Sequence, residues 1–172
     1  MNLHLKPANM EDWKAEYVAM QAMPEDSNGF MNRFCGMSEE EFRNKALPEM
    51  IKNTMLEPSE DLVPQTYLFL WDDDKIVGWF KFRHCLNGKL RTAGGHVGYG
   101  ILPQYRGLGY ATEGLQMVIE LARRIVPEDE LLLTCYKDNV VSRRVMEKNG
   151  AYQADENETY YYMQINLRKE QK

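Results

Sequence analysis

A short segment in the middle of the chain combines the residue types that bind phosphate through the backbone. It reads Gln104-Tyr-Arg-Gly107-Leu-Gly109 and stands between an apolar stretch that ends at Pro103 and a run of helical spacing that begins at Tyr110. Pro103 has no N–H for a strand ladder, and the glycines leave the backbone free of side chains. A loop whose free N–H groups converge on a helix N-terminus attracts anions. The segment therefore predicts a phosphate-binding loop.

Two common nucleotide-binding loops fit this segment poorly. A P-loop requires Gly-Lys-Ser/Thr after four intervening residues, and the chain contains no such triplet. The Rossmann fingerprint requires a third glycine where this chain has Thr112, and its first glycine should follow the strand directly. Here Pro103-Gln-Tyr-Arg intervenes. Neither class of nucleotide-binding protein is favoured.

The segments around the loop have the periodicity of strands and helices. Apolar residues recur at helical spacing from Tyr110, and Pro127 stops the run. The strand expected after this helix would pair in parallel with the strand before it, through a right-handed crossover. Strands are expected at 2–7, 65–71, 76–85, 96–102 and 130–136, with a closing hairpin within 151–167; helices are expected at 10–22, from a capping box at 38–41, at 110–126 and between 139 and 149.

Three loops are expected between these elements. Residues 24–36 hold turn-forming residues and aromatic residues that look exposed, and residues 56–64 hold two prolines and three acids. Asn87-Gly88 is a turn signal. Pro48 is expected either to interrupt or to restart the helix that follows the capping box.

Length and composition indicate a single domain over residues 1–172, long enough to bury a sizeable core. The net charge of −5 argues against a nucleic-acid partner and favours a neutral or cationic one. Residues 1–20 are charged throughout, so neither a signal peptide nor a membrane span is predicted. Cys35, Cys85 and Cys135 form no metal-ligand pattern and suit a reducing compartment. The protein is expected in the cytoplasm without a metal, and Cys135 is expected in the core rather than as a nucleophile.

The loop and two further segments resemble the GNAT superfamily of N-acetyltransferases. Gln104-Tyr-Arg-Gly107-Leu-Gly109 is similar to its Gln/Arg-x-x-Gly-x-Gly/Ala signature. The segment 139–150 is similar to its Asn-x-x-Ser/Ala…Glu-Lys-x-Gly segment, and 96–103 resembles the fourth strand of ribosomal-protein alanine acetyltransferases. More narrowly, 83–87 followed by 94–100 resembles a group of bacterial predicted acetyltransferases.

This resemblance covers nearly the whole chain and implies an α/β (α+β) GNAT fold. Such a fold has a central mixed, mostly antiparallel twisted sheet flanked by helices on both faces. The resemblance implies acetyl-CoA-dependent transfer of an acetyl group directly to a primary amine of a small molecule or peptide. The early helical region would form a wall of the acceptor site, or would be a plain surface helical pair. A non-catalytic acyl-CoA-binding sensor module on the same fold is the alternative. The resemblance leaves open transfer to a hydroxyl, the acyl length, the acceptor and the oligomeric state, a homodimer included.

The resemblance also implies which residues hold acetyl-CoA. The backbone amides of 106–111 would bind the pyrophosphate, and a backbone N–H at the end of the strand would bind the thioester oxygen. An asparagine side chain would reach the pantetheine arm, and Tyr99 and Gly100 would lie against the cofactor. Arg106 would add a charge or remain solvated. The expected cofactor-binding residues are Ile101, Leu102, Arg106, Gly107, Leu108, Gly109, Tyr110, Ala111 and Asn139.

His96 and Ser142 are the expected catalytic residues. Many members of the superfamily carry a glutamate base at the position of His96, and a histidine with a pKa near 6.5 can accept the proton of the amine. A structural histidine is the alternative, with His84 as the second candidate base. Many members have a tyrosine that acts as the general acid at the position of Met146 in this chain. Ser142, Tyr136 or a bound water would therefore protonate the departing thiolate.

Overall fold

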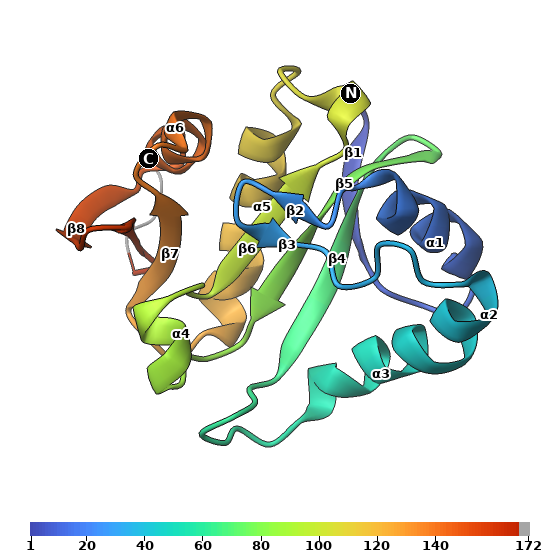
Figure 1. Ribbon diagram of the computed structural model, residues 1–172. Coiled ribbons are helices and arrows are strands. Elements are labelled where there is room, and N and C mark those ends of the chain that lie inside the picture. Colours follow the sequence, from blue (N-terminus) through green and yellow to red (C-terminus); the bar gives the residue numbers. More distant parts are fainter. Residues whose placement is uncertain (169–172) are drawn as a thin grey trace.

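The larger of two antiparallel sheets lies in the middle of the molecule with helices on both faces, and the smaller one lies at its side (Figure 1). In this computed structural model, which describes residues 1–168, the larger sheet has the strand order β1-β4-β5-β6 and the smaller has the order β7-β9-β8. The strands are β1 (Leu3–Pro7), β4 (Gln65–Asp72), β5 (Lys75–Arg83), β6 (Val97–Ile101), β7 (Glu130–Tyr136), β8 (Tyr152–Glu156) and β9 (Tyr160–Asn166). A further small hairpin pairs β2 (Asp26–Ser27) with β3 (Phe30–Met31).

The expected helices occur in the expected order, together with one short helix, α4, that was not expected. They are α1 (Trp13–Ala22), α2 (Glu39–Glu41), a π-helical turn (Phe42–Ala46), α3 (Leu47–Lys52), α4 (Gly88–Thr92), α5 (Tyr110–Ile125) and α6 (Val140–Lys148), with short 3₁₀ turns at Asn53–Met55 and Pro103–Tyr105. The helical segments from α2 to α3 form one continuous run, so Pro48 neither breaks nor restarts it. Asn87 is also not in a hairpin turn, because its side chain caps α4 by accepting a hydrogen bond from the Leu90 N–H at 3.0 Å.

The mixed α/β architecture is confirmed, but the parallel ladder expected between β6 and β7 is not formed. These strands belong to different sheets and meet only at one end. There the His96 N–H donates to the Leu132 carbonyl at 2.7 Å, and the Leu132 N–H donates to His96 Nδ1 at 2.9 Å. Beyond this point β6 and β7 diverge (Figure 1). The crossover helix α5 packs beneath both sheets, so the two strands remain neighbours without forming a ladder.

The larger sheet separates two hydrophobic clusters because the apolar residues of β4 and β5 point to both of its faces. On one face, Phe80 of β5 and Leu115 of α5 belong to the same cluster, which continues to the β7–β9 sheet. On the other face, Trp79 of β5 belongs to a cluster with residues of α1 and with Phe42 of the α2–α3 region. The aromatic side chains expected to be exposed in 24–36 belong to this second cluster, since Phe30 and Phe34 are buried. Their burial holds the β2–β3 hairpin against the sheet.

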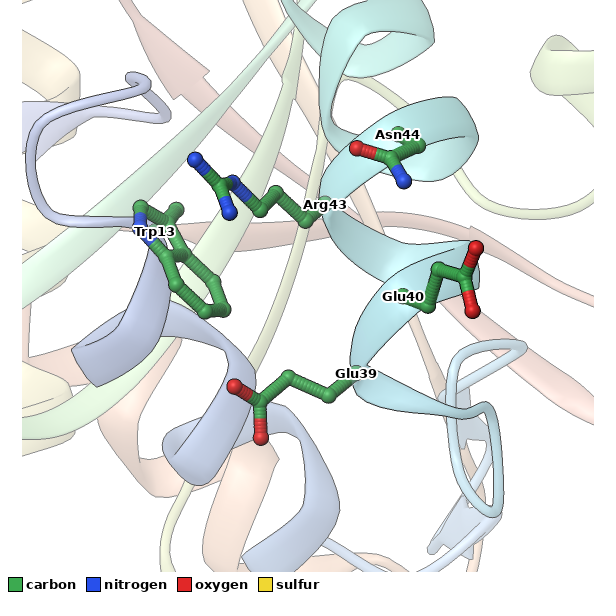
Figure 2. A pocket seen from close by; sticks show the side chains of 5 residues that line it. All are labelled: Trp13, Glu39, Glu40, Arg43 and Asn44. Atoms are coloured by element: carbon green, nitrogen blue, oxygen red, sulfur yellow. The ribbon is translucent and has the colours of Figure 1, made fainter.

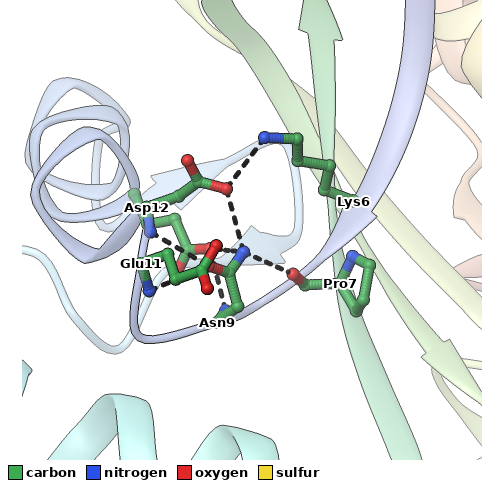
Figure 3. Close-up of polar contacts among 6 residues, drawn as sticks. Lys6, Pro7, Asn9, Glu11 and Asp12 are labelled. Carbon is green, nitrogen blue, oxygen red and sulfur yellow. Dashed lines mark hydrogen bonds and ion pairs between the residues drawn. The ribbon is translucent and has the colours of Figure 1, made fainter.

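A network of polar side chains precedes α1 (Figure 3). Asn9 Oδ1 accepts hydrogen bonds from the N–H groups of Glu11 and Asp12 at 3.0 and 2.9 Å. The Asp12 carboxylate in turn lies 3.0 Å from Lys6 Nζ. One further carboxyl, that of Glu16, is fully buried; its Oε1 accepts from the Asn9 N–H at 3.0 Å, and its Oε2 has no hydrogen-bond partner among the described residues.

Glu16→Gln should stabilise the protein more at pH 8 than at pH 5. Burial raises the pKa of Glu16 from 4.5 to about 8. Between these pH values the unfolded chain releases the proton more readily than the folded one, so the stability of the native protein falls as pH rises. Glutamine keeps the bond from Asn9 without this proton release, and we expect a gain of at least about 1 kcal/mol at pH 8. Urea unfolding at both pH values measures the difference; an equal gain at both would contradict a buried, protonated carboxyl.

Candidate functional site

A cavity of about 840 Å³ opens where β6 and β7 diverge. Segments far apart in the sequence line it: the β2–β3 hairpin, the second half of β5, β6, the loop before α5, the end of β7 and one side of α6. The β2–β3 hairpin lies in front of β6 (Figure 1). The split between the sheets therefore creates a groove that runs from α4, at its closed end, towards the N-terminus of α5, at its open end.

The predicted phosphate-binding loop lies at the open end of this cavity. Gly107 and Gly109 have φ angles of +78° and +88°, which only glycine adopts readily, and Gly109 precedes the first residue of α5. A Cβ atom at either glycine would meet no atom within 4 Å, so the space above the loop is open. The first N–H groups of a helix have no partner within it, and those of Tyr110 and Ala111 belong to residues that line the cavity. Leu108 is exposed and is not among the lining residues.

The edge of β6 that faces β7 supplies further backbone groups. The Leu102 N–H donates to the Val77 carbonyl at 2.9 Å, so Leu102 faces β5 through its backbone. Because hydrogen-bonding direction alternates along an antiparallel strand, the backbone groups of Tyr99 and Ile101 point the other way, into the split. Ile101 and Tyr99 line the cavity, whereas Leu102 is buried outside it.

Arg106 is held in place by the neighbouring segments rather than simply solvated. Its Nε donates to the Ile101 carbonyl at 3.0 Å, and one terminal nitrogen donates to Ser27 Oγ at 2.9 Å. The guanidinium thus joins the end of β6 to the β2–β3 hairpin while still lining the cavity.

Helix α6 forms the opposite wall. Asn139 caps this helix, because its Oδ1 accepts from the Ser142 N–H at 3.1 Å, and its Nδ2 donates to the Asn28 carbonyl at 3.3 Å. The Ser142 hydroxyl lies 2.9 Å from the Tyr99 hydroxyl across the split, and the Tyr99 hydroxyl is also 3.3 Å from the Ser142 carbonyl. Burial is the main cause that raises the pKa of Tyr99, so this phenol keeps its proton. The pair places two hydroxyl groups between β6 and α6.

The structure does not bring His96 into the cavity. Its side chain is fully buried at the closed end of the split, with Nδ1 bonded to Leu132 and Nε2 3.4 Å from Glu128 Oε2. Burial is the largest cause that lowers the pKa of His96, which keeps the ring neutral. His84 also lies outside the cavity lining, and its Nε2 is 2.8 Å from the Thr66 hydroxyl.

Space beside Gly98 and Gly100 is occupied rather than open. The ring of Phe30 would lie 3.5 Å from a Cβ at Gly98 and 2.5 Å from one at Gly100. The glycines therefore allow the β2–β3 hairpin to approach β6. Gly29, at the tip of this hairpin, has a φ of +85° and sits so close to Tyr136 that a Cβ would be 2.3 Å from the ring.

Cys135 and Tyr136 end β7 at the cavity wall. Cys135 is 6% exposed and belongs to the core cluster, yet it also borders the cavity. Burial raises the pKa of its thiol, which disfavours the thiolate. Tyr136 stacks on Tyr160 with ring centroids 5.1 Å apart.

Lys81, Arg83, Arg144 and Lys148 are lining residues that the sequence motifs did not identify. Lys81 and Arg83 stand two residues apart in an otherwise apolar strand. Since alternate residues of a strand share a face, this pair was a usable signal for a charged patch on one side of the sheet.

A second hollow, of about 320 Å³, lies between α1 and α2 (Figure 2). Trp13 and Arg43 face each other across it, with the guanidinium 4.9 Å from the ring. Glu39, Glu40 and Asn44 complete the lining. The side chains of this hollow belong to neighbouring surface helices, and the larger cavity is the one that contains the predicted phosphate-binding loop.

No cluster of three or more His, Cys, Asp and Glu side chains in residues 1–168 is arranged to hold a metal ion. No helix in the same range is both long enough and apolar enough to cross a membrane.

Residues 2–152 match the protein family described as the acetyltransferase (GNAT) domain. The chain is also similar to YnaD of Bacillus subtilis strain 168, named as an uncharacterised N-acetyltransferase, with 24% identity over 163 residues that cover 86% of this chain and 78% of YnaD.

Two solved structures show the same fold. One is yncA from Salmonella typhimurium, described as an acetyltransferase with its cofactor acetyl-CoA, with a TM-score of 0.63, 14% identity, and coverage of 99% of this chain and 96% of that one. The other is RimL, described as a ribosomal-protein α-N-acetyltransferase in complex with coenzyme A through a disulfide to one of its cysteines, with a TM-score of 0.65, 18% identity, and coverage of 95% and 92%. The chain belongs to the GNAT family of acetyltransferases, and it is an acyltransferase.

Proposed function

We propose that the protein transfers the acetyl group of acetyl-CoA directly to a primary amine of a small molecule or peptide. The observation that carries this proposal is that one cavity contains the phosphate-binding loop at its open end and the free edge of β6 beside it. The relatives named for N-acetylation, and the yncA structure described with acetyl-CoA, support the same activity.

The cavity fits the phosphates of acetyl-CoA through charge and backbone geometry. The N–H groups from Gly107 to Ala111 would hold the pyrophosphate, as the dipole of α5 favours an anion there. The Arg106 N–H donates instead to the Pro103 carbonyl at 3.4 Å, so Arg106 would contribute through its side chain. The last turn of α6 lies against the first turn of α5, because Asn149 Nδ2 donates to the Thr112 carbonyl at 3.1 Å. Lys148 therefore adds positive charge at the same end, and Arg144 lies one turn earlier.

The remaining roles follow from the groups along the split. Acetyl-CoA supplies an activated acyl group, and the N–H of Tyr99 or Ile101 would stabilise the negative charge that develops on its carbonyl oxygen. Leu102 is unsuited to this role because its N–H is bonded to Val77. The Tyr99 and Ser142 hydroxyls would protonate the departing thiolate, and Asn139 would hold this end of α6 in position.

The proton of the amine has no carboxylate or imidazole acceptor among the described lining residues. We infer that the amine reacts in its neutral form and that its proton passes to water. His96 then serves the structure: it lies immediately before β6 and binds Leu132 of β7 through its backbone and its side chain, and so fixes the point from which the split opens.

His96→Gln should lower stability while changing kcat little. The substitution disturbs a fully buried hydrogen bond between the two sheets, and we expect a loss of about 1–2 kcal/mol in the free energy of unfolding. The kcat should stay within about fivefold, far below the effect of losing a general base. His84→Gln, which also removes a hydrogen-bonded imidazole outside the cavity, is the matched control. A hundredfold loss of kcat in His96→Gln alone, at unchanged stability, would restore His96 as the base.

A non-catalytic acyl-CoA sensor on the same fold is the second candidate, favoured by the absence of a carboxylate or imidazole among the described lining residues. Thiol release from acetyl-CoA, measured over polyamines, amino acids, aminoglycosides and peptides with free N-termini, separates the two functions. The enzyme should release thiol faster with at least one amine than without any, and mass spectrometry should identify an N-acetyl product. Binding of acetyl-CoA without release for any amine would identify a sensor instead.

A further inference from the structure

The charge of the cavity differs from that of the whole chain. The chain carries a net charge of −5, yet the described lining residues include five cations and no Asp or Glu: Lys81, Arg83, Arg106, Arg144 and Lys148. Three of these cations lie in the loop before α5 and in α6, where the phosphates of the cofactor are expected. Lys81 and Arg83 lie elsewhere in the cavity, so the phosphates of the cofactor do not explain their charge.

Lys81 and Arg83 lie towards the closed end of the split. In the β5–β6 ladder, Gly78 pairs with Ile101 next to the phosphate-binding loop, whereas Lys81 pairs with Gly98. A strand rises about 3.3 Å per residue, so the Lys81–Gly98 pair is about 10 Å from the loop end of β6. Arg83 is two residues further on, and its guanidinium donates to the Gly95 carbonyl at 2.9 Å.

These two cations have no carboxylate partner among residues 1–168. Lys81 Nζ donates to the Met31 carbonyl at 2.6 Å and lies 5.1 Å from the centre of the Phe30 ring. Burial lowers the pKa of Lys81 to about 8, and the nearby cations Arg83 and Arg33 add to this effect. Arg33 is itself 3.6 Å from Glu49, and both of these side chains are exposed.

Uncompensated cations in a partly buried wall are costly unless an anion neutralises them. Neighbouring phenol rings do not supply that charge, because burial raises the pKa of Tyr67, which lies near Lys81 and Arg83. An anionic ligand at this end would satisfy the Lys81 ammonium and the free donors of Arg83. The phosphates of acetyl-CoA are expected at the opposite end, so the ligand must be the other substrate.

We propose that the amine acceptor carries a carboxylate or phosphate group, which Lys81 and Arg83 bind at the closed end of the cavity. This inference rests on the proposed acetyltransferase function. It reverses the preference for a neutral or cationic partner that net charge alone favours, because the local charge of the cavity is positive. A small amino acid or a phosphorylated amine fits this chemistry, and a polyamine does not.

Matched pairs of amines test the acceptor class directly. The pairs are amino acids and their amides, phosphoethanolamine and ethanolamine, and an acidic peptide and its neutral counterpart, with spermidine as a cationic reference. Because the anionic group also changes the pKa of the amine, kcat/KM is compared per concentration of neutral amine. Thiol release from acetyl-CoA should show a kcat/KM at least about tenfold higher for the anionic member of a small-molecule pair. The amino acid and phosphoethanolamine arms distinguish a carboxylate from a phosphate. If only the peptide pair showed a preference for the anionic member, the acceptor would not be a small molecule.

Lys81→Gln provides the test on the protein. The ratio of kcat/KM between the anionic and neutral members should fall about tenfold in this variant. Lys75→Gln makes the same change in the exposed first residue of β5, outside the cavity, and should leave the ratio unchanged. Since the amine reacts in its neutral form, kcat/KM rises with pH in both proteins, but for an anionic acceptor the ratio of kcat/KM between the native enzyme and Lys81→Gln should fall above pH 8, as Lys81 loses its proton.

The outcomes separate this inference from the function on which it rests. Thiol release with spermidine or neutral amines at least as fast as with anionic ones would overturn the anionic acceptor and leave the acetyltransferase standing. A ratio unchanged in Lys81→Gln would overturn the role of Lys81. Thiol release with no amine of the panel would overturn the acetyltransferase function and the inference together.

Discussion

Tyr99→Phe should lower kcat about a hundredfold while leaving the affinity for acetyl-CoA within a few-fold, the size expected when a general acid is removed. The phenol is placed for this role by two contacts across the split, to the hydroxyl and the carbonyl of Ser142. Burial raises its pKa, so the proton is retained over the working range of pH. Phenylalanine keeps the ring that packs 5.6 Å from Phe80, and only the hydroxyl is lost.

Two further variants show whether the effect belongs to the Tyr99–Ser142 pair. Ser142→Ala should cause a smaller loss of kcat, and the double variant should lose less than the product of the single effects, because the two hydroxyls share one task. Tyr136→Phe removes a phenol from the same cavity without touching Ser142, and it should have little effect. A kcat that is retained in Tyr99→Phe but lost in Tyr136→Phe would transfer the role of acid to Tyr136.

Gly109→Asp should weaken acetyl-CoA binding at least tenfold, equivalent to about 1.4 kcal/mol. The substitution places a carboxylate at the N-terminus of α5, where the phosphates are expected, and forces an L-residue to adopt a φ of +88°. Gly109→Ala separates these causes, because it introduces the strained backbone without the charge. Isothermal titration calorimetry measures the affinity of each folded variant.

Gly36→Asp is the matched control for this prediction. Gly36 also has a positive φ, +78°, and open space around its Cβ, but it lies in the segment before α2 and outside the cavity. It should cost stability without changing the affinity for acetyl-CoA. Equal affinities in Gly109→Asp and the native protein would remove the pyrophosphate from this loop.

The parts of the site that follow from local backbone chemistry could be predicted from the sequence. Pro103, the two glycines and the apolar spacing after Tyr110 specify a strand end, a loop and a helix without reference to the rest of the chain. The Asn139 cap of α6 is equally local. Each of these features depends only on residues close together in the sequence, and all of them are present in the structure.

The direction in which β-strand side chains point depends on tertiary packing, and the sequence could not supply it. His96 was assigned to the cavity through its place in the strand expected at 96–102, but it lies just before β6, binds Leu132 of β7, and turns its ring into the closed end of the split. The expected parallel ladder was wrong because β6 and β7 belong to different sheets and are joined at one end through His96 and Leu132.

The turn of the β2–β3 hairpin could have been predicted from the sequence, but it was not. Asn28-Gly29, where both φ angles are positive, is typical of a tight hairpin turn, and it places Phe30 over the glycines of β6. Its contribution to the cavity wall depends on contacts with β6 and Tyr136, which no local pattern contains.

The central claim is that the reacting end of acetyl-CoA lies between β6 and β7. It is tested most directly by locating the coenzyme A thiol in this split. Coenzyme A disulfide can exchange with a nearby cysteine, forming a protein–CoA disulfide and releasing one reduced coenzyme A. Cys135 borders the cavity but is buried, whereas Cys35 is exposed and Cys85 is intermediate. Since burial raises the pKa of the Cys135 thiol, the exchange should be slow and should accelerate as pH rises.

Mass spectrometry of proteolytic fragments should locate the adduct on Cys135, and excess acetyl-CoA should prevent it. Cys135→Ala should remove the adduct and, because no acyl-cysteine is required, should keep turnover within a few-fold of the native rate. An adduct confined to Cys35 or Cys85, or one on Cys135 that acetyl-CoA does not suppress, would contradict the placement of the reacting end of acetyl-CoA between β6 and β7.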